Sequence, residues 1–485
     1  VDRHRMPMAP LLDRGRLFIP GEEVVYAVDP YNGTPLWELD VSGVFRKSVN
    51  KGSGHMLLTE DRLYIAAENQ CWAVQLEDGK QSENFKLDEL GDADSHWGYL
   101  NRAGGLLIGS GEAQSAYVNY SRKAILIDAF VRSIVRPIWP IGGVFVGAAL
   151  MLYVLASVLR IWKGRFLNAP EGARPTNTKI LVSAGVCFVL LCSTGLYSLV
   201  TLGKVALSLR EIDRPQMVSS RYLFAVDRHT GKKAWNYKRG EILNSAIAIE
   251  GERVVFIEKR HAASDFDEDG RIDKLSEFLA EGTWLVAAET KSGKVVWEEQ
   301  VTVPYDHIIY LQAERGIALV SGAYNEEGKS FYRLLAYDIE DGSALWTQEF
   351  RARNLLCTDW AGLRNNHNDL QQRPVIVGDR IFARPYGFNL ETGKQLDYEA
   401  LRGGHGCGGL AGSTHYLFGR GDFARMYPLA VKETQGEAII TVARPGCSLN
   451  LIPASGIVVM PEATAGCTCL YPLQTSFGFI PESVL

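Results

Sequence analysis

An acidic segment from residue 264 to residue 273 is the part of the chain whose residue types and spacing best suit chemistry. The segment matches the first part of an EF-hand-type Ca²⁺-binding loop. Aspartates occupy its positions 1, 3, 5 and 9, namely Asp265, Asp267, Asp269 and Asp273, and Gly270 occupies position 6. Carboxylates at alternate positions can wrap a hard cation, and glycine permits the sharp bend that such a loop needs. The closing carboxylate is displaced by one position, to Glu277. Two interpretations stay open, a Ca²⁺ site that stiffens the loop and a solvated acidic loop.

Cysteines form a second group of chemical interest. Of the eight in the chain, four lie close to the C-terminal end, at Cys407, Cys447, Cys467 and Cys469. An even set in an exported domain favours disulfides. A metal site that adds His405 is the rival interpretation, but the C-x₂-C spacing usual for zinc is missing. Free thiols are the third interpretation.

His405 also lies within a glycine-rich stretch, residues 402–409. Glycine allows a backbone to approach a ligand closely, so this histidine is a weak candidate for binding a cofactor in a central channel. A tight inner strand explains the same glycines equally well. We assign no catalytic residue, and the missing C-x-x-C-H pattern excludes a c-type haem.

A repeated phrase, Ala-x-Asp-x-x-x-Gly-x-x-x-Trp, indicates the elements that must position these side chains. Four copies, the last with Glu in place of Asp, begin at Ala27, Ala225, Ala336 and Ala287. Two weaker copies keep the turn, at Gly79 and Gly393, and lose the tryptophan. Each phrase lies between alternating apolar runs, the pattern of half-buried strands. We expect the glycine to hold a positive φ, the aspartate to bind the amides of its turn, and the tryptophan to wedge between neighbouring units.

Further apolar strands precede each phrase, so each repeat unit is predicted to contain four strands. Eight units are expected, beginning near Met8, His55, Trp97, Glu241, Tyr305, Asp369, Cys407 and Cys447. The predicted fold is all-β, an eight-bladed β-propeller. The repeat resembles the PQQ-like family of propellers, the quinoprotein alcohol dehydrogenase-like superfamily. The segments 446–450 and 466–476 are similar to the ends of large bacterial members of it, which imply no activity for this chain.

One unit is interrupted by two uncharged apolar stretches, residues 137–159 and 180–203. Each exceeds the ~20 residues that cross a bilayer core as a helix. We therefore expect a transmembrane hairpin inserted at residues 120–215, with residues 1–119 and 216–485 forming one propeller. Neither stretch contains a His, Asp, Glu, Lys or Arg residue, so we expect an anchor or assembly surface, with no haem and no ion path.

The short loop between the two stretches is basic, which mildly favours a cytoplasmic loop and a propeller in the periplasm at a bacterial inner membrane. Because the chain begins at Val1 without an apolar leader, we expect either a removed signal or an export role for the first stretch. Gly143 and Gly147 form a small-x-x-x-small pattern that allows close helix packing. We expect membrane-protein partners and contact with the lipid bilayer.

The charge of the chain reduces the number of candidate functions. The net charge is −5, and basic residues cluster only beside the apolar stretches, so nothing indicates a nucleic-acid partner. The favoured function is a non-catalytic scaffold or interaction subunit of a membrane complex. A PQQ-dependent or other periplasmic oxidoreductase is the first alternative, although the adjacent cysteine pair that the resemblance implies for PQQ binding is missing. An envelope assembly factor, similar to the propeller lipoprotein of outer-membrane protein insertion, is the second.

Overall fold

The computed structural model describes residues 9–21, 24–41, 55–90, 94–113, 217–260, 271–272, 275–280, 282–306, 308–327, 329–352, 373–400, 409–421, 423–434, 436–446, 451–461 and 476–480. The chain divides into two units, one made of Val1–Ala116 with Pro215–Leu485 and the other of Tyr117–Arg214. All the strands named in this section belong to the first unit. Both predicted spans and the residues Gly143 and Gly147 lie outside the described residues. Within the described part of the chain, no helix is long and apolar enough to cross a membrane.

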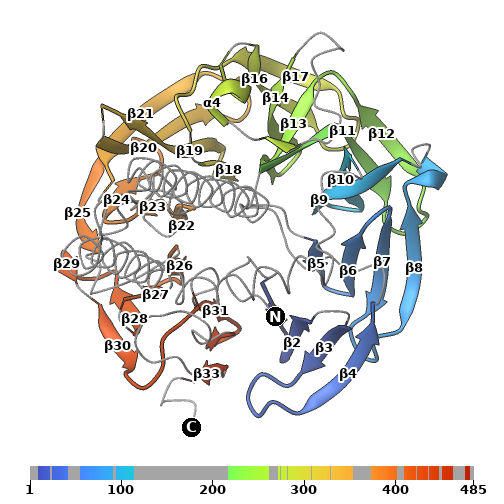
Figure 1. The fold of residues 1–485 in the computed structure, drawn as a ribbon, viewed down its shortest axis with the longest axis horizontal. Helices are drawn as coiled ribbons and strands as arrows, with labels where there is room; N and C mark the ends of the chain where they lie inside the picture. Colours follow the sequence, from blue (N-terminus) through green and yellow to red (C-terminus); the bar gives the residue numbers. More distant parts are fainter. Residues whose placement is uncertain are drawn as a thin grey trace, which may run out of the picture. The chain divides into compact units, whose positions relative to one another are not determined.

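Antiparallel meanders of four strands make up most of this unit (Figure 1). The first contains β1 (Leu11–Asp13), β2 (Arg16–Pro20), β3 (Val24–Val28) and β4 (Pro35–Asp40). The second contains β5 (Met56–Leu58), β6 (Arg62–Ala67), β7 (Gln70–Gln75) and β8 (Gln81–Lys86), followed by a short 3₁₀ helix, η1 (Asp88–Leu90). In each, the outer strand follows a turn that carries the repeated phrase.

A nine-stranded sheet comes next and joins two such meanders. The first is β9 (Ser95–Ala103), β10 (Leu106–Ala113), β11 (Met217–Asp227) and β12 (Lys233–Tyr237), and the second is β13 (Glu241–Glu250), β14 (Arg253–Lys259), β16 (Thr283–Glu289) and β17 (Val295–Gln300). They are joined where β11 pairs with β13, and β15 (Arg271–Ile272) also pairs with β11. Strands β10 and β11 pair along their lengths although residues 114–216 separate them in the sequence.

Four further sheets complete the described unit. The first contains β18 (Ile308–Glu314), β19 (Ile317–Glu326), β20 (Lys329–Asp338) and β21 (Ala344–Arg351), and the second contains β22 (Val375–Val377), β23 (Arg380–Ala383), β24 (Tyr386–Asn389) and β25 (Gln395–Ala400), extended by β29 (Glu433–Thr434). The third contains β26 (Ala411–Gly412), β27 (Tyr416–Arg420), β28 (Ala424–Pro428) and β30 (Glu437–Ile440). The last contains β31 (Ile452–Ala454), β32 (Ile457–Met460) and β33 (Phe477–Phe479). A single α-helical turn, α4 (Leu275–Phe278), lies between β15 and β16.

The hydrophobic core consists of layers between consecutive sheets. One layer joins β2 and β3 to β6 and β7, and includes Phe18 and Leu63. Later layers repeat this arrangement along the chain. The last one returns to the start, because Ile457 and Val459 of β32 pack with Leu17 of β2. Meanders that pack in chain order, with the last against the first, form a β-propeller. The all-β prediction is confirmed.

The repeated phrase forms the contact between one sheet and the next. Trp235 of β12 lies against Gly293 in the β16–β17 turn, and its Nε1 donates a hydrogen bond to the Thr290 carbonyl at 2.8 Å. The three other phrase tryptophans donate in the same way, over 2.9–3.0 Å; these pairs are Trp37 with Leu76, Trp297 with Ile339 and Trp346 with Leu390. The glycines have positive φ, +68° at Gly293. Asp227 Oδ1 accepts from the His229 and Thr230 amides of its own turn. All three expected roles are confirmed.

The two ends of each meander differ in their connections. At one end, tight turns join the first strand to the second and the third to the fourth, as at Gly104 and Gly231. At the other end, the second strand continues to the third and the fourth leads to the next sheet. Because neighbouring strands are antiparallel, all connections of this second kind leave from one end, here called the insertion end. The connection from β10 to β11 and the connection from β14 to β16 are both of this second kind.

Candidate interaction sites

Most residues singled out in the sequence lie outside the described part of the chain. This applies to the aspartates 265, 267, 269 and 273, to His405, and to Cys407, Cys447, Cys467 and Cys469. Calcium binding and disulfide pairing therefore stay predictions. Glu277 is described and lies exposed in α4. Among the described residues, no group of three or more His, Cys, Asp or Glu side chains is placed to hold a metal ion.

Cys71 is a described cysteine, and its thiol is free and fully buried in β7. Burial raises the pKa of the Cys71 thiol well above its usual value, because the apolar surroundings disfavour the thiolate. It packs with Tyr64, Phe85 and Trp97 between two sheets. Cys71 is therefore part of the core and not a reactive site.

A backbone pairing links the acidic segment to the re-entry point of the inserted segment. The described strand β15 lies between residues 261–270 and 273–274, and its Ile272 pairs with Met217, the first residue of β11. Met217 and Ile272 are both buried in the same apolar layer. The described residues next to the acidic segment are thus paired with the strand that follows residue 216.

A buried polar network lies beside this link. The side chains of Ser110, Ser220 and Asn244 are at most 2 % exposed, and they come from β10, β11 and β13. The two serine hydroxyls lie 2.8 Å apart and approach Asn244 Oδ1 at 3.0 and 2.6 Å. Asn244 Nδ2 donates to Glu112 Oε2 at 2.9 Å, and Ser219 donates to the buried carboxylate of Glu241. Hydrogen bonds compensate the cost of burying these groups.

Gly98 of β9 explains how the polar network fits against the inner strand. A Cβ atom at Gly98 would approach Asn244 Nδ2, Ser220 Oγ and Glu112 Oε2 within 2.6–2.8 Å. The network therefore fixes the ends of β10 and β11, from which residues 114–216 depart, to the neighbouring strand β13. Sequence analysis missed it, although polar residues inside the apolar runs 106–113 and 241–250 were the available signal.

An ion-pair cluster joins the β5–β8 and β9–β12 meanders at the end opposite the insertion end, here called the turn end. Arg228 is 8 % exposed, and its guanidinium lies 3.1 Å from Glu60 and 3.0 Å from Asp61. Hydrogen bonds from its own backbone and from Arg102 lower the pKa of Glu60. The cluster keeps the β5–β8 and β9–β12 meanders in a fixed relation at the site described next.

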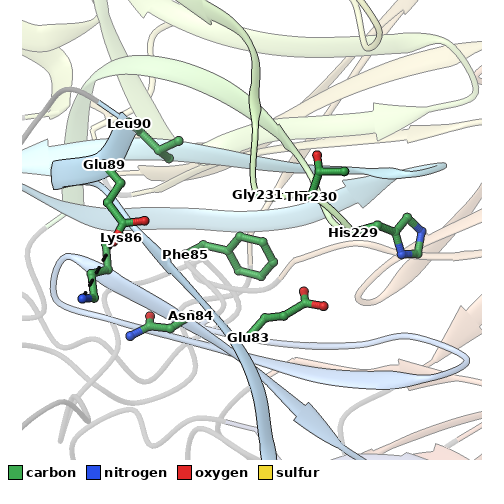
Figure 2. Close-up of a pocket in the computed structure, with 9 residues that line it drawn as sticks. All are labelled: Glu83, Asn84, Phe85, Lys86, Glu89, Leu90, His229, Thr230 and Gly231. Carbon is green, nitrogen blue, oxygen red and sulfur yellow. Dashed lines mark ion pairs between the residues drawn. The ribbon is translucent and has the colours of Figure 1, made fainter.

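A cavity of about 250 Å³ lies between β8 and the β11–β12 turn. It is lined by Glu83, Asn84, Phe85, Lys86, Glu89, Leu90, His229, Thr230 and Gly231. Figure 2 shows the Phe85 ring between the β8 side chains and the turn residues His229 and Thr230. Lys86 pairs with Glu89 at 3.8 Å. The cavity is small compared with typical ligand pockets of roughly 300–1,000 Å³ and has an aromatic floor with a polar rim.

The model of the family "Outer membrane protein assembly factor BamB" matches residues 3–135 and 217–419. The chain belongs to this family. The match resumes at residue 217, where β11 begins, so most of the inserted segment is not part of the family pattern.

The chain is also similar to solved structures. BamB from Moraxella catarrhalis is 10 % identical, with a TM-score of 0.44, over 99 % of this chain and 95 % of that chain. The quinohemoprotein alcohol dehydrogenase from Comamonas testosteroni is 11 % identical, with a TM-score of 0.51, over 98 % of this chain and 75 % of that chain. No curated protein matches this chain. The predicted resemblance to PQQ-like propellers is confirmed by the family match and by the second structure, which at this identity supports the fold alone.

Proposed function

We propose that this protein is a membrane-attached propeller that works by binding protein partners in the bacterial envelope, as an assembly factor or scaffold. The observation that carries the proposal is the family match on both sides of the inserted segment, residues 3–135 and 217–419. The name of that family describes proteins that assist the assembly of outer-membrane proteins. In our proposal the present chain keeps the partner-binding propeller and adds an anchor of its own.

The proposed architecture is one eight-bladed ring interrupted in its third blade by a transmembrane hairpin. It is supported by the sequence spans at 137–159 and 180–203 and by the layers that connect the first sheet to the last. The insertion end then faces the bilayer, because residues 114–216 leave and re-enter there. The turn end, with its short connections, is left for partners on the periplasmic side.

The polar network of Ser110, Ser220 and Asn244 suits this arrangement. An anchor transmits force to the strands that hold it, and the network bonds both of those strands to β13. No step in this proposal uses a redox cofactor. The quinoprotein alternative has only a likeness of fold in its favour.

The test uses the full-length protein extracted in mild detergent and separated on native gels. Wild type should migrate in a larger membrane assembly, and Gly143→Leu with Gly147→Leu should release it with the propeller still folded by circular dichroism. Val144→Leu, one residue away on another face of the predicted helix, is the control and should leave the assembly intact. Wild-type protein that migrates alone and oxidises an alcohol when PQQ and Ca²⁺ are added would refute the proposal.

A further inference from the structure

The contact between the second and third meanders differs from the four contacts that contain a phrase tryptophan. Where the phrase is complete, a tryptophan on the outer strand covers the turn glycine of the next meander. A Cβ atom placed on that glycine would lie 2.5–2.7 Å from the indole ring at Gly79, Gly293, Gly342 and Gly393. These four turns therefore each hold a ring in direct contact with the backbone.

Strand register identifies the residue that replaces tryptophan in β8. Trp37 pairs with Ala27, and Trp235 pairs with Ala225. In β7 and β8 the equivalent pair is Ala73 with Glu83. A carboxylate therefore occupies the position from which an indole would reach the β11–β12 turn. Glutamate provides neither an aromatic face nor an N–H donor there.

The turn that would receive this ring is otherwise built like its equivalents. Gly231 has a φ of +68°, and Asp227 accepts hydrogen bonds from its turn amides. The nearest ring is Phe85, 3.6 Å from a Cβ atom placed on Gly231, about one ångström farther away than the tryptophans are from their glycines. The cavity of Figure 2 lies at this contact, and Glu83 and His229 are among the residues that line it.

A second contact that lacks tryptophan shows how such a site can be covered from within the chain. In β25 the equivalent position is Asp397, which is bonded to Lys432 of the following sheet, and β29 pairs alongside β25. At β8, the described residues place a cavity instead of a covering strand. At the other turns, the indole N–H donates to the carbonyl three residues before the turn glycine. In the β11–β12 turn, whose glycine is Gly231, this carbonyl belongs to Arg228.

We propose that the cavity between β8 and the β11–β12 turn binds an aromatic side chain, best an indole, from a partner protein. The partner's ring would pack against Phe85 beside the β11–β12 turn and donate to the Arg228 carbonyl, which is equivalent to the carbonyls that accept from the chain's own tryptophans. The inference rests on the proposed partner-binding function and names one of its contact points. Glu83, Asn84 and His229, the polar residues at the rim of the cavity, would hydrogen-bond to the partner's backbone on either side of the inserted ring.

The test uses the full-length protein and 5-fluoro-N-acetyltryptophanamide, followed by ¹⁹F line broadening. The probe should bind wild type, and the matched N-acetylalaninamide, followed by saturation-transfer NMR, should not. Glu83→Trp fills the cavity from within, so it should raise the melting temperature and weaken probe binding at least tenfold. Glu38→Trp adds a tryptophan at an exposed position of β4 and should leave probe binding unchanged. If Glu83→Trp does not fold, Glu83→Phe makes the same test with a smaller ring.

Equal probe binding by wild type and Glu83→Trp, or no binding by wild type, would overturn the inference even if the native-gel assembly is intact. Loss of the assembly from Glu83→Trp, with Glu38→Trp still assembled, would place the partner's aromatic group in this cavity. A wild type that binds the probe and migrates alone on native gels would count against the proposed function only.

Discussion

The indole ring of Trp235 and the backbone of Gly293 are in direct contact across the boundary between two meanders. A Cβ atom added to Gly293 would lie 2.7 Å from Trp235 Cδ2, far inside the normal separation of two carbons. The same tryptophan donates to the Thr290 carbonyl at 2.8 Å. One residue thus provides both packing and a hydrogen bond to the next sheet, which explains why the spacing of the phrase is fixed.

Replacement of Gly293 by alanine should therefore destabilise the propeller for two reasons. The positive φ penalises any Cβ by about 1–2 kcal/mol, and overlap with the indole adds about 1–3 kcal/mol. Gly251→Ala is the matched control, because Gly251 also has a positive φ, +55°, and nothing lies within 4 Å of its Cβ position. Urea unfolding measures both variants. Equal losses would mean that the Trp235 contact contributes no steric constraint.

Much of this architecture could be predicted from the sequence. The phrase fixed the position of each outer strand, because its glycine, aspartate and tryptophan each have a local requirement that few other residues meet. The first strands begin at Met56, Ser95 and Glu241, close to the predicted His55, Trp97 and Glu241. The final sheets were harder to place, because they lack the turn signal.

The interaction sites were harder to predict than the fold. Asn244 and Ser110 are ordinary polar residues in apolar strands, and only the pairing of β11 with β13 brings them together. The cavity at Glu83 exists because one copy of the repeat lacks its tryptophan, and its size depends on the orientation of the Phe85 ring. Calcium binding by the acidic segment and the pairing of the C-terminal cysteines stay predictions.

Asn244 gives a prediction about pH. Its Nδ2 donates to the fully buried Glu112 carboxylate, so Asn244→Asp replaces a donor with a second carboxylate. Two adjacent negative charges disfavour the ionised folded state, so this variant should be less stable than wild type at pH 7 and recover as the pH falls. Asn236→Asp, on the exposed side of β12, is the control. Thermal melts between pH 5 and 8 that show no recovery for Asn244→Asp would contradict the network geometry.

Asn244→Ala separates the hydrogen bonds from the charge. It removes the amide and leaves the buried polar groups of Ser110, Ser220 and Glu112 without that partner. The expected loss is about 1–3 kcal/mol at pH 7, with a weaker dependence on pH than that of Asn244→Asp, because no second carboxylate is introduced.

Glu298 gives a prediction of the opposite sign. Hydrogen bonds from Arg260 Nη2 and Arg239 Nη1, both 2.8 Å, lower the pKa of its carboxyl. Because the folded pKa is below the unfolded value of about 4.3, the stabilisation is present above that value and is lost as the pH falls through the folded pKa. Glu298→Gln should flatten this acid-side loss, by up to about 1 kcal/mol at low salt. Glu299→Gln, the exposed neighbour, should keep it. If wild type and Glu298→Gln lose stability equally as the pH falls, the ion pairs of Glu298 do not contribute to stability.

The acidic segment gives the last prediction. If Asp265, Asp267, Asp269 and Asp273 bind Ca²⁺, the ion should raise the melting temperature by mass action, because it binds only the folded loop. The effect should reach the third meander, since Ile272 next to the loop pairs with Met217 where the inserted segment re-enters. Hydrogen exchange at β11 should therefore slow on addition of Ca²⁺ in wild type. Asp265→Asn with Asp269→Asn should abolish both effects, whereas Asp306→Asn, an aspartate in the link before β18, should keep them. Equal stabilisation by Mg²⁺ would indicate general charge screening, and an unchanged response in the double variant would eliminate the site.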